Sequence, residues 1–432
     1  MSRFLFVMPP LAGHVNPTIA VGQELDRRGH RTAWTGHGRL VAQLLPPDAR
    51  LFPAGGTTPW YDEPEEEARA QHARWLNLRG LAGIKFFWEE TMIPLARTML
   101  RGVEDAVDAF RPDVLVVDQQ ALAGAAVARR RGLPWATSAT TSAELIRPYA
   151  LLPKVEAWVR ELLEAFQRDY GIDAATARRG DLRFSDQLVL AFTTPELMGS
   201  FDAPGSPVFV GPALGSRPHD VDFPWGWLDP GPPGARRRRV LVSLGTLNGE
   251  AGGQFYPVAL EAFAARADSL QVILAAPPGT VDAVPDNVVV RGFVPQLELL
   301  PHLDAVLSHG GHNTVCEALA HGLPLVVAPI RDDQSIVAGQ VVATGAGVRV
   351  KFGRVRPPEL RGALDAVLGD PAYAAAARRI AASFASAGGA AAAADHLERL
   401  ARASPAGPPL RLAALVLQQQ PSSPGTSRVS RS

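Results

Sequence analysis

Short apolar runs followed by helical segments constrain the fold of this chain more than any other feature of its sequence. FLFVM at residues 4–8 precedes a helical segment at about 17–28, and RTAWTG follows it. DVLVVD at 113–118 precedes a helix rich in Ala and Arg, and PWATSA comes next. Continuous apolar runs of this length, alternating with helices, are typical of buried parallel strands. The pattern therefore predicts an α/β fold built on a parallel sheet.

The same alternation starts again after a segment rich in proline and glycine, which runs from about 211 to 239. RVLVSLGT, LQVILAA, NVVVRGF, AVLSH and LPLVVAPI are the predicted strands of this second block. Two Rossmann-like domains joined by a linker would face each other across a cleft, and such sheets bind ligands at the carboxyl ends of their strands. The expected organisation is an N-terminal domain at 1–215, a linker at 216–239, a second domain at 240–385, a helix at 386–403 that packs back on the first domain, and a disordered tail at 404–432.

Composition narrows the setting and the classes of partner. Lys and Arg number 43, as do Asp and Glu, so the chain lacks the basic excess that nucleic acids or anionic membranes attract. The single cysteine, Cys316, cannot form an intrachain disulfide, which favours a reducing compartment. No apolar run approaches the ~18 residues of a membrane span. We expect a cytoplasmic protein without a nucleic-acid partner or membrane insertion; the sequence does not indicate its oligomeric state.

The segment SHGGHNTVCEALAHG, which begins at residue 308, marks a change from strand to helix. Asn313 or Thr314 is expected to cap this helix. Gly311 would let the backbone approach a ligand closely, and the ring of His309 could donate a hydrogen bond. Free amides and the positive end of the helix dipole together form a seat for an anion. A tight turn with a capping Asn and no ligand would use the same residues, so this segment alone leaves both interpretations open.

Three other strand ends in the second block carry complementary chemistry. SLGT places the hydroxyl of Thr246 at the edge of the sheet, and RGFVPQ supplies Phe293 as a flat surface for a base and Gln296 as an amide partner. IRDDQ ends a further strand with Asp333 and Gln334, which suit sugar hydroxyls. An anion seat, a base platform and sugar-binding groups on one edge favour a nucleotide sugar as ligand.

A nicotinamide dinucleotide is the natural competitor for such a fold. It requires G-x-G-x-x-G after a strand and an acid at the end of the next strand. The first loop, PPLAGHVNP, contains one glycine, and RTAWTGHG ends without an acid. The sequence therefore disfavours a dinucleotide cofactor.

The N-terminal domain offers a candidate proton acceptor. His14 is expected in the loop after the first strand, before a helix capped by Asn16 with Pro17 as its first residue. A neutral imidazole can take a proton from a hydroxyl near neutral pH. Asp118, at the carboxyl end of DVLVVD, could hold the other ring nitrogen. Loop histidines and strand-end acids are also common without any catalytic role.

The stretch from Arg291 to Gln334 resembles the nucleotide-sugar signature of the family-1 glycosyltransferases. These are two-domain inverting enzymes of the GT-B fold, and they include plant secondary-metabolite and bacterial macrolide glycosyltransferases. FVPQ, LLPHLDAVLSHGGHNTVCEALAHGLPLVVAPIRDDQ, SLGT and the opening PPLAGHVNPTIAVGQEL all follow the pattern. The resemblance therefore spans about residues 1–400 and implies a GT-B fold and transfer of a sugar.

The resemblance also implies where the nucleoside and the sugar are held. Phe293 stacks on the nucleobase, Gln296 lies near the base and ribose, and Glu317 binds the ribose hydroxyls. Asp333 and Gln334 address the hydroxyls of the sugar. Their likeness to the plant signature favours glucose, although a UDP- or TDP-linked deoxyhexose stays open.

The resemblance also implies which residues bind the diphosphate and which residue acts as general base. His309, Asn313 and Thr314 hold the diphosphate, with Thr246 nearby. The resemblance places a His–Asp dyad at His14 and Asp118, with the histidine as general base. His312 departs from the pattern, since plant members have Trp there and many macrolide enzymes have a small residue.

The implied reaction is metal-independent, since the helix end and a histidine stabilise the leaving diphosphate. Asp332 and Asp333 are adjacent and do not form the D-x-D of a manganese site. Aromatic and apolar residues at 60–88 and 145–166 favour a hydrophobic small-molecule acceptor such as a polyketide, macrolide, flavonoid or terpenoid, although they could equally form ordinary core helices. A nucleotide-sugar epimerase of the same fold and a non-catalytic auxiliary protein are the alternatives.

Overall fold

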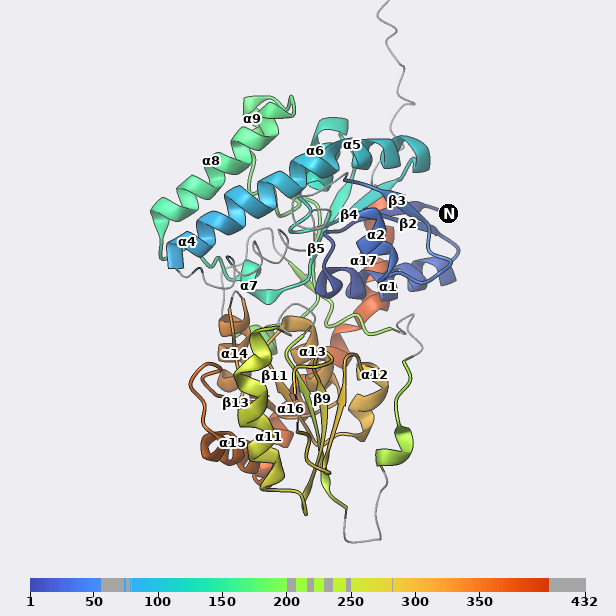
Figure 1. The fold of residues 1–432 in the computed structure, drawn as a ribbon. Helices are drawn as coiled ribbons and strands as arrows, with labels where there is room; N and C mark the ends of the chain where they lie inside the picture. The colour runs from blue at the N-terminus through green and yellow to red at the C-terminus, as the bar shows by residue number, and fades with distance from the viewer. Residues whose placement is uncertain are drawn as a thin grey trace, which may run out of the picture.

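The computed structural model describes residues 1–55, 74, 78, 80–199, 207–215, 221–228, 236–245, 250–281, 283–331 and 333–403. These residues form two α/β domains, the N-terminal one above the C-terminal one in Figure 1. Each domain is built on one parallel sheet, and the predicted pair of Rossmann-like units is confirmed.

The N-terminal sheet has its topological switch point between β1 and β4. Phe6 of β1 pairs with Trp34 of β2 on one side and with Val116 of β4 on the other. Chain connections leave these two central strands in opposite directions, which opens a crevice at their carboxyl ends. The strands, in sheet order, are β3 (Leu51–Pro53), β2 (Arg31–Gly36), β1 (Arg3–Val7), β4 (Val114–Asp118), β5 (Trp135–Ala139), β6 (Val189–Ala191) and β7 (Val208–Phe209).

The C-terminal sheet repeats this arrangement with its switch point between β8 and β11. Ser243 of β8 pairs with Ser308 of β11, so the segments after both strands start side by side. The strands, in sheet order, are β10 (Val288–Arg291), β9 (Leu270–Ala275), β8 (Arg238–Ser243), β11 (Ala305–Ser308), β12 (Leu325–Val327) and β13 (Gly347–Arg349).

Helices cover both faces of the N-terminal sheet because its strands are apolar on both faces. Phe4 and Phe6 of β1 pack toward α1 (Ala12–Arg27) and α17 (Gly389–Ala403). Leu5 and Val7 pack on the opposite side, with α5 (Ile93–Phe110) and α6 (Leu122–Arg131). The remaining helices of this domain are α2 (Gly38–Ala42), α4 (Gly80–Lys85), the π-helix η1 (Phe86–Met92), α7 (Ser142–Leu145), α8 (Pro153–Asp169), α9 (Ala174–Ala177) and α10 (Pro195–Met198).

The C-terminal sheet is also covered on both faces. Its two cores contain residues of α13, α14 and α16 on one face and of α11 and α15 on the other. The helices are α11 (Phe255–Ala264), α12 (Gln296–Leu299), α13 (His312–Ala320), α14 (Gln334–Ala343), α15 (Pro357–Gly369) and α16 (Pro371–Ala387), with 3-10 turns η2 (Trp225–Leu228), η3 (Glu250–Gly253) and η4 (Leu300–His302).

The aromatic segments of the N-terminal domain contribute to its core. Phe86 and Trp88 of η1 are buried, as are Leu145 and Phe166. Trp60, Tyr61 and Trp75, which the sequence places in the same acceptor region, lie outside the described residues. The buried aromatic residues of these segments therefore serve mainly to pack the core of the N-terminal domain.

The last described helix, α17, returns to the N-terminal domain. Figure 1 shows it beside α1, and Arg28 Nη1 lies 2.5 Å from Asp395 Oδ1. His30 Nε2 lies 3.1 Å from Glu398 Oε1 on the same helix. The residues of the tail at 404–432 lie outside the described residues.

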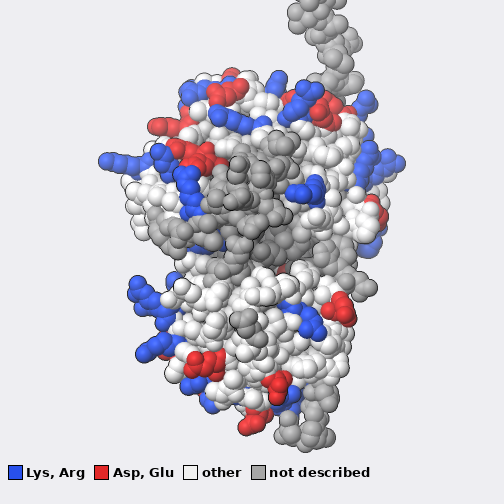
Figure 2. Space-filling model, in the orientation of Figure 1, with Lys and Arg blue, Asp and Glu red and all other residues white. Residues whose placement is uncertain are grey.

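The surface is mixed in charge. Figure 2 shows Lys and Arg interspersed with Asp and Glu over the face in view. Among the described helices, none is both long and apolar enough to cross a membrane.

Close packing of α1 on β2 generates a first prediction. A Cβ atom on Gly22 would lie 2.5 Å from Trp34 Cζ2. The indole cannot easily move, because it stacks on Phe6 at 5.1 Å and its Nε1 donates to Thr18 Oγ1. Gly22→Ala should therefore lower the free energy of unfolding by about 1–3 kcal/mol, as overpacked cores do.

The measurement is urea unfolding beside Gly362→Ala as a control. Gly362 lies within α15 and has open space around it, so an alanine there should stabilise the helix by about 0.5–1 kcal/mol. Equal stability of Gly22→Ala and the unchanged protein would contradict the packing argument.

Candidate active site

His14 and Asp118 meet at the switch point of the N-terminal sheet. The Nδ1 atom of His14 lies 3.0 Å from Asp118 Oδ1 and 2.9 Å from Oδ2. The Asp118 side chain is fully buried and the His14 side chain is 15% exposed. A carboxylate can only accept hydrogen bonds, so Nδ1 carries the ring proton and Nε2 keeps a lone pair. This is the tautomer that a general base requires.

The surroundings of His14 favour its charged form once a proton is taken up. Burial lowers the pKa of His14, but the charge of Asp118 and its hydrogen bond outweigh this effect. Asp333 and Glu144 add smaller contributions of the same sign, so the pKa of His14 lies above its ordinary value. Asp118 therefore supports both the useful tautomer and the imidazolium.

The prediction that His14 lies in a loop before a cap at Asn16 was wrong. Helix α1 begins at Ala12, so His14 belongs to its first turn and Pro17 lies inside the helix. Pro17 has no N–H, and the Gly13 carbonyl that it would have paired with needs another donor. That donor comes from the other domain, because Asn313 Nδ2 lies 2.7 Å from Gly13 O.

The cap predicted at Asn313 or Thr314 was also wrong. Helix α13 begins at His312, and Gly311 is its N-cap without a side-chain cap. Asn313 and Thr314 lie in the first turn, and the side chain of Asn313 spans the two domains instead. The first backbone amides of α13 therefore have no capping side chain, which is the arrangement that binds anions.

The ring of His309 fills the space beside this helix end. A Cβ atom on Gly311 would lie 2.4 Å from His309 Nε2, and one on Gly245 would lie 2.7 Å from Cε1. Both glycines are thus required for the ring to fit. His309 is 8% exposed, and burial lowers its pKa to about 4. The ring is neutral near pH 7 and acts as a hydrogen-bonding group without a charge.

Two residues expected at the ribose lie in contact. Gln296 Nε2 donates to Glu317 Oε2 over 2.5 Å, which joins the start of α12 to α13. Phe293 is 48% exposed, although large apolar side chains are usually covered. The structure therefore brings an amide–carboxylate pair together on the C-terminal domain, and Phe293 of the same domain is about half exposed.

The residues expected at the sugar lie at the start of α14. Asp333 Oδ2 accepts a hydrogen bond from Thr141 Oγ1 of the N-terminal domain over 2.6 Å. Gln334 Oε1 accepts from the backbone amides of Ile330 and Arg331, so it orders the loop before the helix. Thr246 lies outside the described residues.

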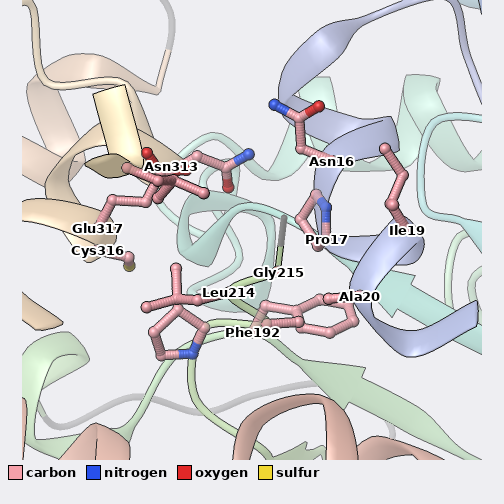
Figure 3. A pocket seen from close by; sticks show the side chains of 13 residues that line it. Asn16, Pro17, Ile19, Ala20, Phe192, Leu214, Gly215, Asn313, Cys316 and Glu317 are labelled. Atoms are coloured by element: carbon pink, nitrogen blue, oxygen red, sulfur yellow. The ribbon is translucent and has the colours of Figure 1, made fainter. Parts of the chain in front are cut away.

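A small pocket lies between the two domains and is lined by residues of both. Figure 3 shows Asn16 and Ile19 of α1 on one wall and Asn313 and Glu317 of α13 on the other. The pocket therefore adjoins both the helix that carries His14 and the helix expected to bind the donor.

Sequence reasoning missed the hydroxyl residues that follow β5. Thr140 Oγ1 lies 2.8 Å from His14 Nδ1, and Ser142 Oγ donates to Gln340 Oε1 of α14 over 2.8 Å. His312, whose role the sequence left open, is buried and reaches Ser142 Oγ and the Phe192 carbonyl at 3.4 and 3.3 Å. The available signal was the run TTS at the end of a strand next to β4, since Asp118 pairs with Ser138.

Comparisons with known proteins find relatives of this chain over most of its length. The family model for the C-terminal domain of proteins like erythromycin biosynthesis protein CIII matches residues 264–400. The 4'-demethylrebeccamycin synthase of Lentzea aerocolonigenes is 32% identical and aligns over 92% of this chain and 99% of its own length. Demethyllactenocin mycarosyltransferase of Streptomyces fradiae is 31% identical over 86% of this chain and 80% of its own length.

Solved structures share the architecture. The glycotransferase of kitacinnamycin superimposes with a TM-score of 0.70 at 27% identity, over 92% of this chain and 99% of its own. The spinosyn rhamnosyltransferase SpnG gives a TM-score of 0.71 at 22% identity over 92% of this chain and 100% of its own, a likeness of fold.

Gln119, which follows Asp118, generates a prediction about stability. Its side chain is 1% exposed, and within the described part of the chain neither amide atom has a hydrogen-bond partner. An unpaired buried polar group costs about 1–3 kcal/mol. Gln119→Leu should therefore raise the free energy of unfolding by about 1 kcal/mol, which thermal or urea unfolding would measure.

Gln167 provides a matched control, since it is also 1% exposed but fully engaged. Its Nε2 donates to two carbonyls and its Oε1 accepts from Arg129. Gln167→Leu should destabilise the fold. If both substitutions destabilise alike, Gln119 is not an unsatisfied group.

Proposed function

This chain belongs to the natural-product glycosyltransferases of the GT-B fold, and we propose that it is an inverting hexosyltransferase. In this proposal a sugar moves from a nucleoside diphosphate to a hydroxyl of a hydrophobic small molecule. The observation that carries it is the contact of 2.9 Å between His14 Nδ1 and Asp118, since it leaves Nε2 able to take a proton.

The attack uses His14 as general base. His14 Nε2 removes the proton of the acceptor hydroxyl as its oxygen attacks the anomeric carbon from the face opposite the diphosphate. The bond from that carbon to the phosphate oxygen breaks, and its electrons leave with the diphosphate. Asp118 stabilises the imidazolium, and a second base is not required. Inversion gives a β-glycoside from an α-linked donor.

The leaving group is received by the C-terminal domain. The uncapped amides at the start of α13 and the positive end of its dipole meet the negative charge that develops on the diphosphate. The neutral ring of His309 donates a hydrogen bond there. In this proposal these groups take over the work that a metal ion performs elsewhere.

The donor lies along the carboxyl edge of the C-terminal sheet. Phe293 stacks on the base, and the contacting pair Gln296 and Glu317 holds the ribose. Asp333 and Gln334 address the sugar, which favours glucose. The name of the Streptomyces fradiae relative specifies mycarosyl transfer, so TDP-linked deoxysugars belong in any donor panel.

The acceptor is a hydrophobic molecule that enters on the side of the N-terminal domain. Leu81 is 63% exposed and Leu151 is 93% exposed, and both lie in the segments expected to face the acceptor. The names of the two relatives described above refer to demethylrebeccamycin and demethyllactenocin, so molecules of these kinds belong in an acceptor panel.

Replacing the base tests the assignment. Purified chain with UDP-glucose, or another member of a UDP- and TDP-hexose panel, and 7-hydroxycoumarin should yield a glycoside. His14→Ala should lower the rate about 10²–10⁴-fold, since a general base contributes that much. The thermal shift caused by the nucleotide should not change, because His14 lies on the other domain.

His321→Ala is the control, since His321 is exposed at the end of α13. It should transfer at the rate of the unchanged protein. Full activity of His14→Ala would refute the assigned base. A sugar isomer formed from donor alone, detected by NMR, would identify an epimerase instead.

The pH profile provides a second test. His14 must be neutral to accept a proton, and its pKa lies above the ordinary value of about 6.5. At saturating donor, kcat/KM for the acceptor should rise with pH and level off above a pKa greater than 6.5. Asp118→Asn removes the largest effect that raises the pKa of His14, so the apparent pKa should fall and the rate should drop. If kcat/KM of the unchanged protein levelled off above a pKa lower than 6.5, this electrostatic account would be wrong.

A further inference from the structure

We propose that Thr140 is a positioning residue for the His14–Asp118 pair, acting through both of its members. The inference rests on the proposed function only in taking His14 as the base. Thr140 follows β5 and is 3% exposed. Its Oγ1 atom lies 2.8 Å from His14 Nδ1 and 2.9 Å from Asp118 Oδ2. One hydroxyl group thus touches the imidazole and the carboxylate at once.

The available protons fix the direction of these hydrogen bonds. Asp118 can only accept, and its Oδ1 already accepts from the backbone amide of Gln120 over 2.8 Å. Thr140 has one hydroxyl proton and donates it to Asp118 Oδ2. Its lone pair then faces the Nδ1–H of His14, which is shared between the hydroxyl and the carboxylate. Thr140 therefore fixes the rotation of the carboxylate and the plane of the ring together.

The backbone around Thr140 is held from the C-terminal domain. Thr141 Oγ1 donates to Asp333 Oδ2 over 2.6 Å, and Ser142 Oγ donates to Gln340 Oε1 over 2.8 Å. Three successive hydroxyl residues therefore make three different contacts: Thr140 with His14, Thr141 with the start of α14, and Ser142 with the middle of α14. These contacts between the domains hold the backbone next to Thr140, and they thereby keep its hydroxyl against His14 and Asp118.

Thr137, on the same strand, provides a control that distinguishes positioning of the dyad from ordinary packing. Its side chain is fully buried, and its hydroxyl donates to the Arg183 carbonyl and accepts from the Ser185 amide. It makes no hydrogen bond to His14 or Asp118 among the described residues. Thr137→Val should lower stability without touching the base, which makes it the matched control for Thr140→Val.

The first measurement is the steady-state kinetics of Thr140→Val and Thr140→Ser beside the unchanged protein. Valine keeps the shape of threonine and removes the hydroxyl, so kcat should fall about tenfold with KM for the acceptor changed less than about twofold. Thr140→Ser keeps the hydroxyl and should recover most of kcat. Thr137→Val should keep kcat even where its Tm falls.

The second measurement needs no acceptor. In protein labelled with ¹⁵N-histidine, the Nδ1–H proton of His14 should give a signal protected from exchange with water. Thr140→Val should broaden it, whereas Thr140→Ser and Thr137→Val should retain it. If Thr140→Val does not fold, Thr140→Ala takes its place in both measurements.

The outcomes separate this inference from the proposed function. Unchanged kcat and an unchanged signal in Thr140→Val, with His14→Ala inactive, would overturn the positioning role and leave the base in place. Equal losses in Thr140→Val and Thr140→Ser would assign the effect to packing and overturn it too. Full activity of both Thr140→Val and His14→Ala would instead remove the base assignment itself.

Discussion

The hydrogen bond from Asn313 Nδ2 to the Gly13 carbonyl joins the N-terminal ends of two helices from different domains. It exists because Pro17 cannot supply the N–H that would otherwise take this carbonyl. The contact holds the first turn of α1, which carries His14, against the first turn of α13, which carries the expected phosphate seat. This contact therefore fixes the spacing between the two helix starts, one of which carries His14 and the other the expected phosphate seat.

This arrangement creates an electrostatic conflict that Asp118 resolves. The N-terminal end of a helix is positive and disfavours a cation in its first turn, and burial of His14 acts in the same direction. A histidine there would hold a proton weakly without a counter-charge. Asp118, fully buried and within 3.0 Å, reverses the balance. In the proposed reaction, the positive end of α13 would support departure of the diphosphate, and Asp118 would support transfer of the proton to His14.

Sequence patterns sufficed for the parts of the molecule that depend on local periodicity. FLFVM, DVLVVD and AVLSH are buried strands, and the residues that follow them converge because parallel strands end at one edge. The predicted starts of two helices were wrong for a physical reason. Asn16 with Pro17, and Asn313 or Thr314, have the chemistry of local caps. The side chain of Asn313 instead donates a hydrogen bond to the Gly13 carbonyl, 300 residues away in the sequence. The run TTS at the end of a strand gave only a weak signal for Thr140, since hydroxyl residues are common at strand ends and only the neighbouring Asp118 and His14 give this one a role.

The contact of Thr141 with Asp333 shows how one residue can serve both the interface and a ligand. A carboxylate has two oxygens that accept hydrogen bonds, and Thr141 occupies Oδ2. Among the described residues, Oδ1 has no such partner, so the expected bond to a sugar hydroxyl does not require the domains to separate. The threonine instead fixes the rotation of the carboxylate before the sugar arrives, which lowers the entropy lost on binding. Because Thr140 and Thr141 are adjacent, the group expected at the sugar and the group expected to take the proton are oriented by the same short piece of chain.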